Sequence, residues 1–287
     1  MNEVTATETH GQEVRSGERF AFGENWGRFL NVLDEQRIQQ AVDSLKEKLA
    51  VDNLKGKSFL DIGSGSGLFS LAARRLGAKV LSFDYDPQSV ACTKELRRRF
   101  FENDGEWDVQ TGSVLDINYL RNLGNFDVVY SWGVLHHTGD MWAALANVNT
   151  NVAAGGKLFI ALYNNQGFPS RVWLRMKKIY NRLPRALKPL FAFLVYFPLE
   201  CRAFLYLLVL GKPGVYFANI AHYKKNRGMS WWHDKIDWIG GYPFEVSKPE
   251  QVFDFYRKLG YSLTALTTCR GELGCNEFVF QRDPKIS

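Results

Sequence analysis

The chain has 287 residues, of which 46% are hydrophobic and 23% charged, and these are the proportions of a globular protein rather than a disordered one. A net charge of +6 is modest, so composition alone leaves nucleic acid, an anionic membrane surface or an anionic substrate as partners. The four cysteines include no Cys-x-x-Cys pair, which argues against a disulfide framework or a zinc knuckle and favours a reducing, intracellular setting.

The N-terminal half of the chain predicts an α/β core. Residues 1–18 are polar and lack the apolar stretch of a signal peptide, so we expect a flexible N-terminus. Apolar residues at helical spacing over 35–50 predict an amphipathic helix. Further along, strands are predicted at 58–62, 79–83, 107–110, 126–131 and 157–163, with helices at 67–76, at 87–100 and near 140–153, and with a turn at Gly155-Gly156. This alternation predicts a doubly wound, mostly parallel sheet over residues 19–163.

The regular alternation stops after Tyr163 and resumes near Ser247. A helix is predicted at 249–259, followed by strands at 262–267 and 277–281 with no helix between them, which favours an antiparallel hairpin at the edge of the sheet. The expected organisation is therefore a core at 19–163, a helical insertion or substrate lid at 164–246, and completion of the core by 247–287.

A glycine-rich turn follows the first predicted strand. Glycines stand at 63, 65 and 67, and the second strand ends at Asp84. Glycine supplies positive φ and lets a ligand approach the backbone, while a carboxylate can accept from a ribose diol. The spacing is G-x-G-x-G, which differs from the G-x-G-x-x-G fingerprint of dinucleotide sites. A turn without a ligand is the structural alternative.

This turn, with Asp61 before it and Asp84 after it, resembles the class I S-adenosylmethionine (SAM) dependent methyltransferases, and in particular their quinone-biosynthesis O-methyltransferase-like group. The resemblance implies a Rossmann-like sheet of seven strands and SAM as the cofactor. This chain has Ser113 at the position where similar enzymes commonly have an aspartate. The resemblance therefore implies that the Ser113 hydroxyl or Asp116 accepts a hydrogen bond from the adenine amine. The residues implied in cofactor binding are Asp61, Gly63, Ser64, Gly65, Gly67, Asp84, Tyr85, Ser113, Val114, Ser131 and Trp132.

Two groups of residues are candidates for catalysis. His136 and His137 follow the fourth strand, and a neutral imidazole can accept a hydroxyl proton. Adjacent side chains point different ways, so one of the two is expected to face the acceptor, and we favour His136; a structural role for both is the alternative. His233 and Asp237 are helical i, i+4 neighbours in an aromatic segment that forms either a substrate lid or a capping helix. No metal site is predicted, because the spacing of these residues matches no established ligand motif.

The insertion contains the densest charge and the longest apolar run. Seven basic residues and no acid occur between Arg171 and Lys188, and residues 190–210 are almost wholly apolar apart from Pro198, Glu200 and Arg202. A proline and two charges argue against a membrane span and favour an interfacial hairpin or amphipathic pair on an anionic membrane. An internal helical subdomain and a homodimer contact are the alternatives. Nucleic-acid binding is not predicted, because no recognition motif accompanies the basic residues.

These features together predict a cytoplasmic SAM-dependent methyltransferase, peripheral at the inner membrane surface, that methylates a small-molecule or lipid-linked acceptor at oxygen. The alternatives are a nucleic-acid or protein methyltransferase and a non-catalytic SAM-binding, membrane-associated protein. Against the nucleic-acid alternative, residues 131–134 contain no N-P-P-Y-like tetrapeptide.

Overall fold

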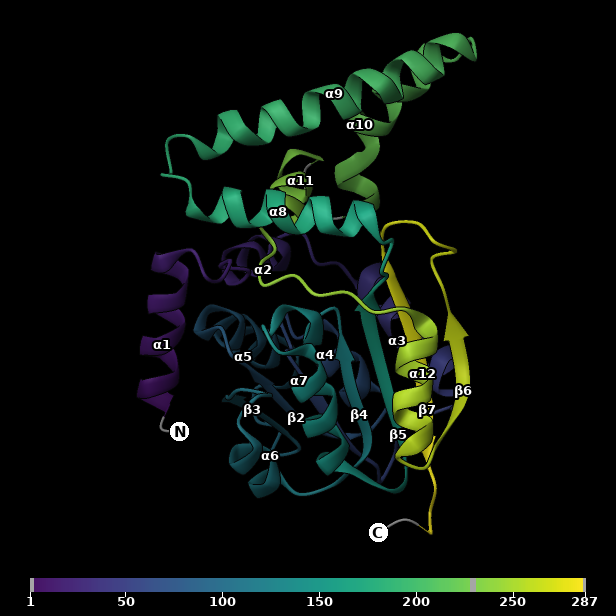
Figure 1. The fold of residues 1–287 in the computed structure, drawn as a ribbon. Helices are drawn as coiled ribbons and strands as arrows, with labels where there is room; N and C mark the ends of the chain where they lie inside the picture. Colours follow the sequence, from purple (N-terminus) through teal and green to yellow (C-terminus); the bar gives the residue numbers. More distant parts are fainter. Residues whose placement is uncertain (1–2, 228–230, 286–287) are drawn as a thin grey trace.

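The computed structural model describes residues 3–227 and 231–285, with the side chains of 3–7, 24, 28, 223–227 and 233 outside the description. A seven-stranded sheet in the order β3-β2-β1-β4-β5-β7-β6 lies at its centre (Figure 1). The strands are β1 Ser58–Ile62, β2 Lys79–Asp84, β3 Trp107–Thr111, β4 Phe126–Trp132, β5 Val152–Tyr163, β6 Tyr261–Thr267 and β7 Cys275–Arg282. Strands β1 to β5 are parallel, whereas β7 pairs antiparallel with β5 and β6. The predicted doubly wound sheet with a C-terminal hairpin is confirmed.

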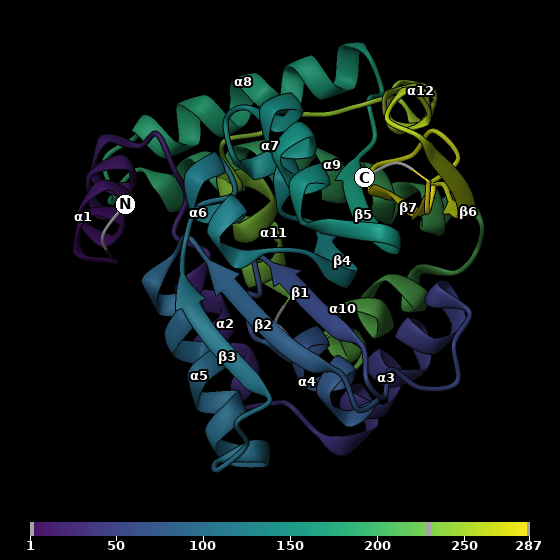
Figure 2. The same cartoon turned by 90° about the horizontal axis from the view of Figure 1, so that it is seen from below.

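Helices cover both faces of this sheet, as Figure 2 shows from below. Helices α3 (Glu35–Leu49), α4 (Leu68–Arg75) and α5 (Pro87–Phe101) pack on one face, while α6 (Ile117–Leu123), α7 (Met141–Val148) and α12 (Pro249–Lys258) pack on the other. Neighbouring strand residues divide between the two faces: Phe59 and Val128 belong to the first core cluster, and Leu60 and Val129 to the second. Burial on both faces explains why these strands are continuous apolar runs.

Strand β5 differs from the sequence prediction. It begins at Val152 rather than at Lys157 and runs through Gly155 and Gly156, where a turn was predicted. The pairing of β4 with β5 shifts register between Phe126 and Val128, and a Cβ at position 156 would lie 2.9 Å from the carbonyl oxygen of Ala153. The two glycines therefore permit an irregularity inside a strand, which a local pattern does not distinguish from a turn.

The N-terminal segment also differs from the expectation of a flexible terminus. Residues Glu3–Ser16 form helix α1, and a second helix, α2, covers Gly23–Leu30. The contacts that hold α1 are polar: Glu13 pairs with Arg19, and His10 faces Asp86 at 3.9 Å. A helix anchored by polar side chains carries no apolar periodicity, and so hydrophobic patterning does not predict it.

The segment between β5 and α12 is helical. It contains α8 (Phe168–Arg182), α9 (Lys188–Val209), α10 (Pro213–Arg227) and α11 (Trp231–Gly240), which form a layer beyond the end of β5 (Figure 1). A small core of its own joins α8, α9 and α11, with Tyr180, Ala192, Tyr196 and Ile239 buried. This layer covers the edge of the sheet where the parallel strands end.

Candidate active site

The glycine turn joins β1 to α4 at the carboxyl edge of the sheet. Gly63, Gly65 and Gly67 have φ angles of 76°, 54° and 81°, a region that other residues rarely adopt. A Cβ on Gly63 would lie 2.4 Å from the Val134 side chain, and one on Gly65 would lie 3.0 Å from the Trp26 indole. Ser64 is fixed beneath the turn, because its hydroxyl hydrogen-bonds that of Thr93 at 2.9 Å. Glycine is thus required at 63 and 65 both by the positive φ and by the close packing of Val134 and Trp26 on the turn.

Asp84, at the end of β2, faces this turn. Its Oδ2 accepts from the Gly65 N–H and its Oδ1 from the Asp86 N–H, both at 2.9 Å. Each carboxylate oxygen has a second acceptor position, so a ribose diol can still be bound. Burial raises the pKa of Asp84 to about 6. The edge therefore combines a turn of three positive-φ glycines with a carboxylate that keeps free acceptor positions, which is the chemistry that a ribose diol requires.

Asp61 lies away from the open edge, although the resemblance implied that it binds the cofactor. It is 2% exposed and accepts from the Ser70 hydroxyl of α4, and burial raises its pKa to about 7. The same hydroxyl contacts Ser82 at 2.7 Å, which accepts from Trp107 Nε1 at 2.9 Å. This buried chain of hydrogen bonds ties α4 to β2 and β3, so Asp61 supports the turn from below.

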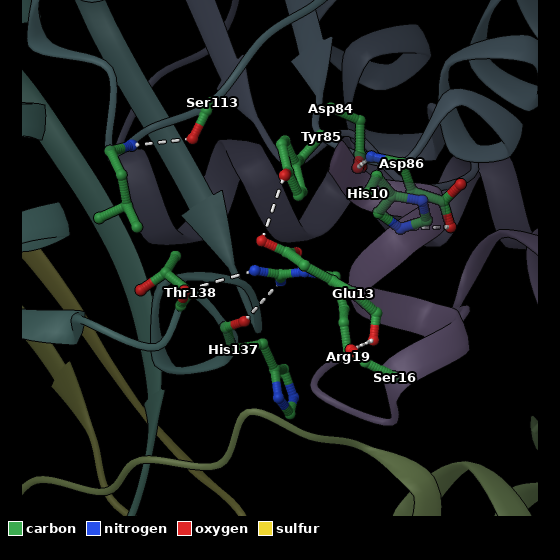
Figure 3. A network of polar contacts seen from close by, with 11 residues as sticks. His10, Glu13, Ser16, Arg19, Asp84, Tyr85, Asp86, Ser113, His137 and Thr138 are labelled. Carbon is green, nitrogen blue, oxygen red and sulfur yellow. Dashed lines mark hydrogen bonds and ion pairs between the residues drawn. The ribbon is translucent and has the colours of Figure 1, made fainter. Parts of the chain in front are cut away.

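The residues after β3 and β4 have mixed placements. Ser113 lies on the same edge as Asp84 and Tyr85 (Figure 3), and its hydroxyl accepts from the Leu115 N–H at 3.2 Å. Val114 is 6% exposed, and Asp116 caps α6 by accepting from two backbone N–H groups.

Ser131 and Trp132, at the end of β4, make contacts within the sheet. The buried Ser131 hydroxyl donates to the Ile62 carbonyl at 3.0 Å and joins β4 to β1. Trp132 donates its indole N–H to Glu277 of β7 at 3.0 Å. Ser113 and Tyr85 thus lie at the same edge as Asp84, whereas Asp116 caps α6.

Two N-terminal residues cover this edge: Arg19, which sequence reasoning did not single out, and Trp26, which the sequence indicated could reach the cofactor or the acceptor. Arg19, just after α1, donates to the carbonyl oxygens of His137 at 2.9 Å and Thr138 at 3.4 Å, as Figure 3 shows. Its guanidinium also lies 4.9 Å from the centre of the Tyr85 ring. Trp26 of α2 lies against Gly65. The N-terminal helices thus form one wall of the site.

The two candidate histidines lie in a short 3-10 helix, Leu135–His137, directly after β4. His136 is fully buried, and its Nδ1 accepts from the Tyr163 N–H at 3.3 Å. His137 is 9% exposed, and its Nδ1 lies 2.5 Å from the Pro243 carbonyl oxygen. Burial lowers the pKa of both imidazoles, that of His137 to about 3, so both rings are neutral at physiological pH.

Aromatic rings from three parts of the chain surround these histidines. Phe22 lies 5.0 Å from the His137 ring, and Tyr163 lies 3.8 Å from His136 and 5.3 Å from His137, measured between ring centres. Trp238 and Phe244 pack on the other side of Tyr163, at 5.3 and 5.4 Å. These rings form an aromatic wall around the two histidines.

The predicted pair of His233 and Asp237 is only partly described. The His233 side chain lies outside the described part of the structure, whereas Asp237 accepts from the side-chain amide of Asn25. This contact connects α11 to α2 across the site. Among the side chains that are described, no three His, Cys, Asp or Glu residues come together as metal ligands.

Lys177 of α8 is a further residue that sequence reasoning did not single out. It is fully buried, donates to the Trp238 carbonyl, and lies 4.4 Å from the Trp238 ring centre and 4.8 Å from that of Phe244. Burial lowers its pKa to about 7. The available signal was its spacing, because Trp173, Lys177 and Tyr180 share the inner face of α8.

A sequence model described as a methyltransferase domain matches residues 33–193, more than half of the chain. The ubiquinone biosynthesis O-methyltransferases of Xanthomonas axonopodis pv. citri (strain 306) and Xanthomonas oryzae pv. oryzae (strain PXO99A) are each 34% identical to the chain over 105 residues. The match covers 37% of this chain and 42% of each relative. It therefore spans less than half the length of these relatives.

Solved structures share the fold. Magnesium protoporphyrin IX methyltransferase from Synechocystis PCC 6803 with bound SAH is 16% identical, with a TM-score of 0.52 over 91% of this chain and 95% of that one. PKMT2 from Rickettsia typhi in complex with AdoHcy is 12% identical, with a TM-score of 0.54 over 86% of this chain and 54% of that one. The domain match, the seven-stranded sheet, the glycine turn and Asp84 agree, and the chain belongs to the SAM-dependent methyltransferases, with SAM as its cofactor.

Proposed function

We propose that the protein transfers the methyl group of SAM to an oxygen of a small-molecule or lipid-linked acceptor, with His137 as the base. The observation that carries this proposal is the contact between His137 Nδ1 and the Pro243 carbonyl oxygen. A carbonyl oxygen only accepts, so Nδ1 carries the proton of the neutral ring and Nε2 keeps its lone pair. The segment that carries this ring packs on the glycine turn, because Val134, three residues before His137, lies against Gly63.

His136 has the opposite tautomer. Its Nδ1 accepts from the Tyr163 N–H, so the proton of the neutral ring lies on Nε2. That Nε2 is buried and has no hydrogen-bond partner among the described residues. Taking a second proton would create an unpaired charge in a fully buried ring. The structure therefore favours His137 over His136, the residue that sequence analysis preferred, and we assign His136 a packing role.

In this proposal the protein aligns the acceptor and removes its proton. The bound cofactor supplies an electrophilic methyl group on a sulfonium. His137 Nε2 accepts the hydrogen bond of the acceptor hydroxyl and orients its oxygen. As the methyl–oxygen bond forms, the proton passes through Nε2 to solvent, because burial lowers the pKa of this imidazole to about 3. The products are a methyl ether, S-adenosylhomocysteine and a released proton. Trp238 and Phe244 exclude water from the aromatic wall, and Asn25 and Asp237 hold α2 and α11 together around it.

The test uses purified protein, methyl-labelled SAM and a metabolite and lipid extract from cells that contain the protein. Mass spectrometry should find the label in a methyl ether, and S-adenosylhomocysteine should accumulate with it. His137→Gln should abolish most labelling, while the matched variant His136→Gln should retain SAM binding and much of the turnover. Label on carbon, nitrogen, protein or nucleic acid would contradict O-methylation of a small or lipid-linked acceptor.

We also propose that α9 lies on an anionic membrane. Among the described residues it is the one helix long and apolar enough to cross a bilayer, and 11% of its most apolar 18-residue window is buried. Glu200 argues against crossing, because it pairs with Lys235 of α11 and holds the middle of α9 against the protein. The exposed apolar side chains are Leu190, Phe193, Leu194, Phe197, Leu199, Leu205, Tyr206, Leu208 and Val209. Such a helix suits the membrane interface, with its apolar side chains toward the acyl boundary.

Basic residues flank both ends of this helix. Arg182 and Arg185 precede it and Lys212 follows it, all exposed. The protein should sediment with vesicles of phosphatidylcholine and phosphatidylglycerol but not with phosphatidylcholine alone. Changing these three residues to glutamine should release it. A control removes three exposed charges from other parts of the surface, by Lys79→Gln, Arg121→Gln and Lys258→Gln, and should bind as wild type.

A homodimer that covers α9 is the competing arrangement. It predicts a two-chain mass in solution and no binding to anionic vesicles, and this result would overturn the membrane proposal.

A further inference from the structure

An aromatic cavity of about 500 Å³ lies between α9, α10 and α11. Its walls include Phe193, Phe197 and Phe204 from α9, Phe217 from α10, and Trp231 and Trp232 from α11. This volume is within the range of small-molecule sites in proteins, roughly 300 to 1,000 Å³. The cavity lies in the helical layer and is distinct from the glycine turn and the histidines.

Three polar side chains of this lining, Tyr196, Glu200 and Tyr216, have partners within the protein. The Tyr216 hydroxyl donates to Glu200 Oε2 at 2.9 Å, and Glu200 Oε1 pairs with Lys235 at 2.5 Å. The Tyr196 hydroxyl donates to the Lys235 carbonyl at 2.8 Å. The walls therefore offer a ligand mainly aromatic faces. A peptide would lose hydrogen bonds for its backbone amides here, whereas a hydrocarbon chain has none to lose.

One side of the cavity reaches the surface that we assign to the membrane. Phe193 and Phe197 line the cavity and are also 49% and 54% exposed on α9. A chain that leaves the bilayer could therefore enter without crossing polar protein surface. The apolar face and the cavity share these two side chains, which makes them continuous.

Helix α11 supplies side chains both to the cavity and to the aromatic rings around the proposed base. Trp231 and Trp232 line the cavity at the start of α11, and Trp238 near its end packs on Tyr163. Tyr163 in turn packs on the His137 ring. Seven helical residues span about 10 Å, so the cavity and the aromatic wall are one short helix apart.

We propose that this cavity binds a single acyl or prenyl chain of the acceptor, so that its head group reaches His137. The inference rests on the proposed function and narrows the acceptor to one that carries a hydrocarbon chain. Burial of the chain against aromatic side chains supplies binding free energy remote from the reacting oxygen, which the enzyme can use to position that oxygen.

The test is a binding measurement that needs neither SAM nor turnover. The probe is 11-bromoundecan-1-ol, whose bromine quenches tryptophan fluorescence at short range. The wild-type protein should show saturable quenching, whereas 3-bromopropan-1-ol at the same concentration should show little. Cys201→Phe, which fills the cavity, should abolish the saturable component. The matched variant Leu199→Phe, on the same helix but outside the lining, should preserve it.

A second readout uses the wild-type protein, so that it does not depend on a variant folding. Cys201 lines the cavity, so undecan-1-ol should slow its reaction with N-ethylmaleimide about tenfold, because thiol reactivity follows access. Peptide mass spectrometry should show unchanged labelling of Cys269, which lies elsewhere. Equal protection of both cysteines, or equal quenching by long and short alcohols, would overturn the inference.

The two proposals can fail separately. If an extract yields a methyl ether on an acceptor without a hydrocarbon chain and undecan-1-ol does not protect Cys201, the cavity assignment is wrong and methyl transfer by His137 stands. If the chain binds but no methyl ether forms, the cavity stands as a binding site and the proposed function is wrong.

Discussion

Replacing Asp84 by asparagine should weaken SAM binding and, at pH 7, stabilise the fold. The carboxylate accepts from two backbone N–H groups, and we expect it to accept from the ribose hydroxyls of bound SAM as well. Asparagine keeps one acceptor oxygen but replaces the other by an NH2 group, which cannot accept a hydrogen bond from the N–H or O–H donors on that side. Losing charge-assisted hydrogen bonds of about 1.5 to 3 kcal/mol raises the Kd roughly 10- to 150-fold.

The stability effect follows from the pKa of Asp84. Burial raises it from 3.8 to about 6, so charging this group opposes folding as pH rises through that window. A shift of two pKa units corresponds to about 3 kcal/mol of destabilisation by the charged carboxylate, which asparagine removes. The loss of one backbone hydrogen bond reduces this gain in stability by about 1 kcal/mol. Asp84→Asn should therefore raise the free energy of unfolding at pH 7 by about 1 to 2 kcal/mol. The gain should disappear at pH 4, where the wild-type carboxyl is protonated.

Calorimetry with SAM measures the first effect, and urea denaturation at pH 4 and pH 7 measures the second. Asp116→Asn is the matched control, because Asp116 caps α6 at the same edge and asparagine is an equally good cap. The control should change neither quantity greatly. Unaltered SAM affinity in Asp84→Asn would remove Asp84 from the cofactor site, and a less stable variant at pH 7 would refute the desolvation argument.

Three further predictions concern the base, the buried lysine and the turn. His137→Gln should lower kcat about 10²- to 10⁴-fold with SAM affinity retained, and single-turnover kinetics beside calorimetry would check this; a normal kcat would rule out His137 as the base. Burial lowers the Lys177 pKa from 10.5 to about 7, so between pH 7 and 10 the unfolded chain holds one proton more than the folded protein, and the free energy of unfolding rises with pH. Lys177→Met removes this group and should therefore remove most of that rise. Urea midpoints across this range test it, and parallel curves for both proteins would contradict it. Gly63→Ala should cost about 1 to 3 kcal/mol of stability through its φ of 76°. Val134→Ala removes the methyl carbons at 2.4 and 2.5 Å but keeps a Cβ at 2.9 Å and leaves the φ strain, so full rescue of the melting temperature would count against this reasoning.

Much of the cofactor side could be predicted from local patterns. The runs that became β1 and β4 are apolar because both faces of those strands are buried, and the G-x-G-x-G spacing places glycine where positive φ is needed. The C-terminal hairpin follows from two strand patterns with no helix between them. In each case the sequence signal lies within a few consecutive residues, so hydrophobic periodicity and turn residues are enough to detect it.

The acceptor side was decided by contacts between distant parts of the chain. His136 and His137 are neighbours in sequence, yet their tautomers are set by the Tyr163 N–H, 27 residues away, and by the Pro243 carbonyl, 106 residues away. Lys177 is one of seven basic residues between 171 and 188; helical spacing places it on the same face as Trp173 and Tyr180, but its burial against Trp238 is decided by the tertiary structure. The sequence alone thus determined the family, the sheet and the cofactor turn. The tertiary structure was needed for the choice of base, the anchoring of α1 and the aromatic cavity. These depend on hydrogen bonds and burial between residues far apart in the chain, and such contacts produce no regular spacing of residue types.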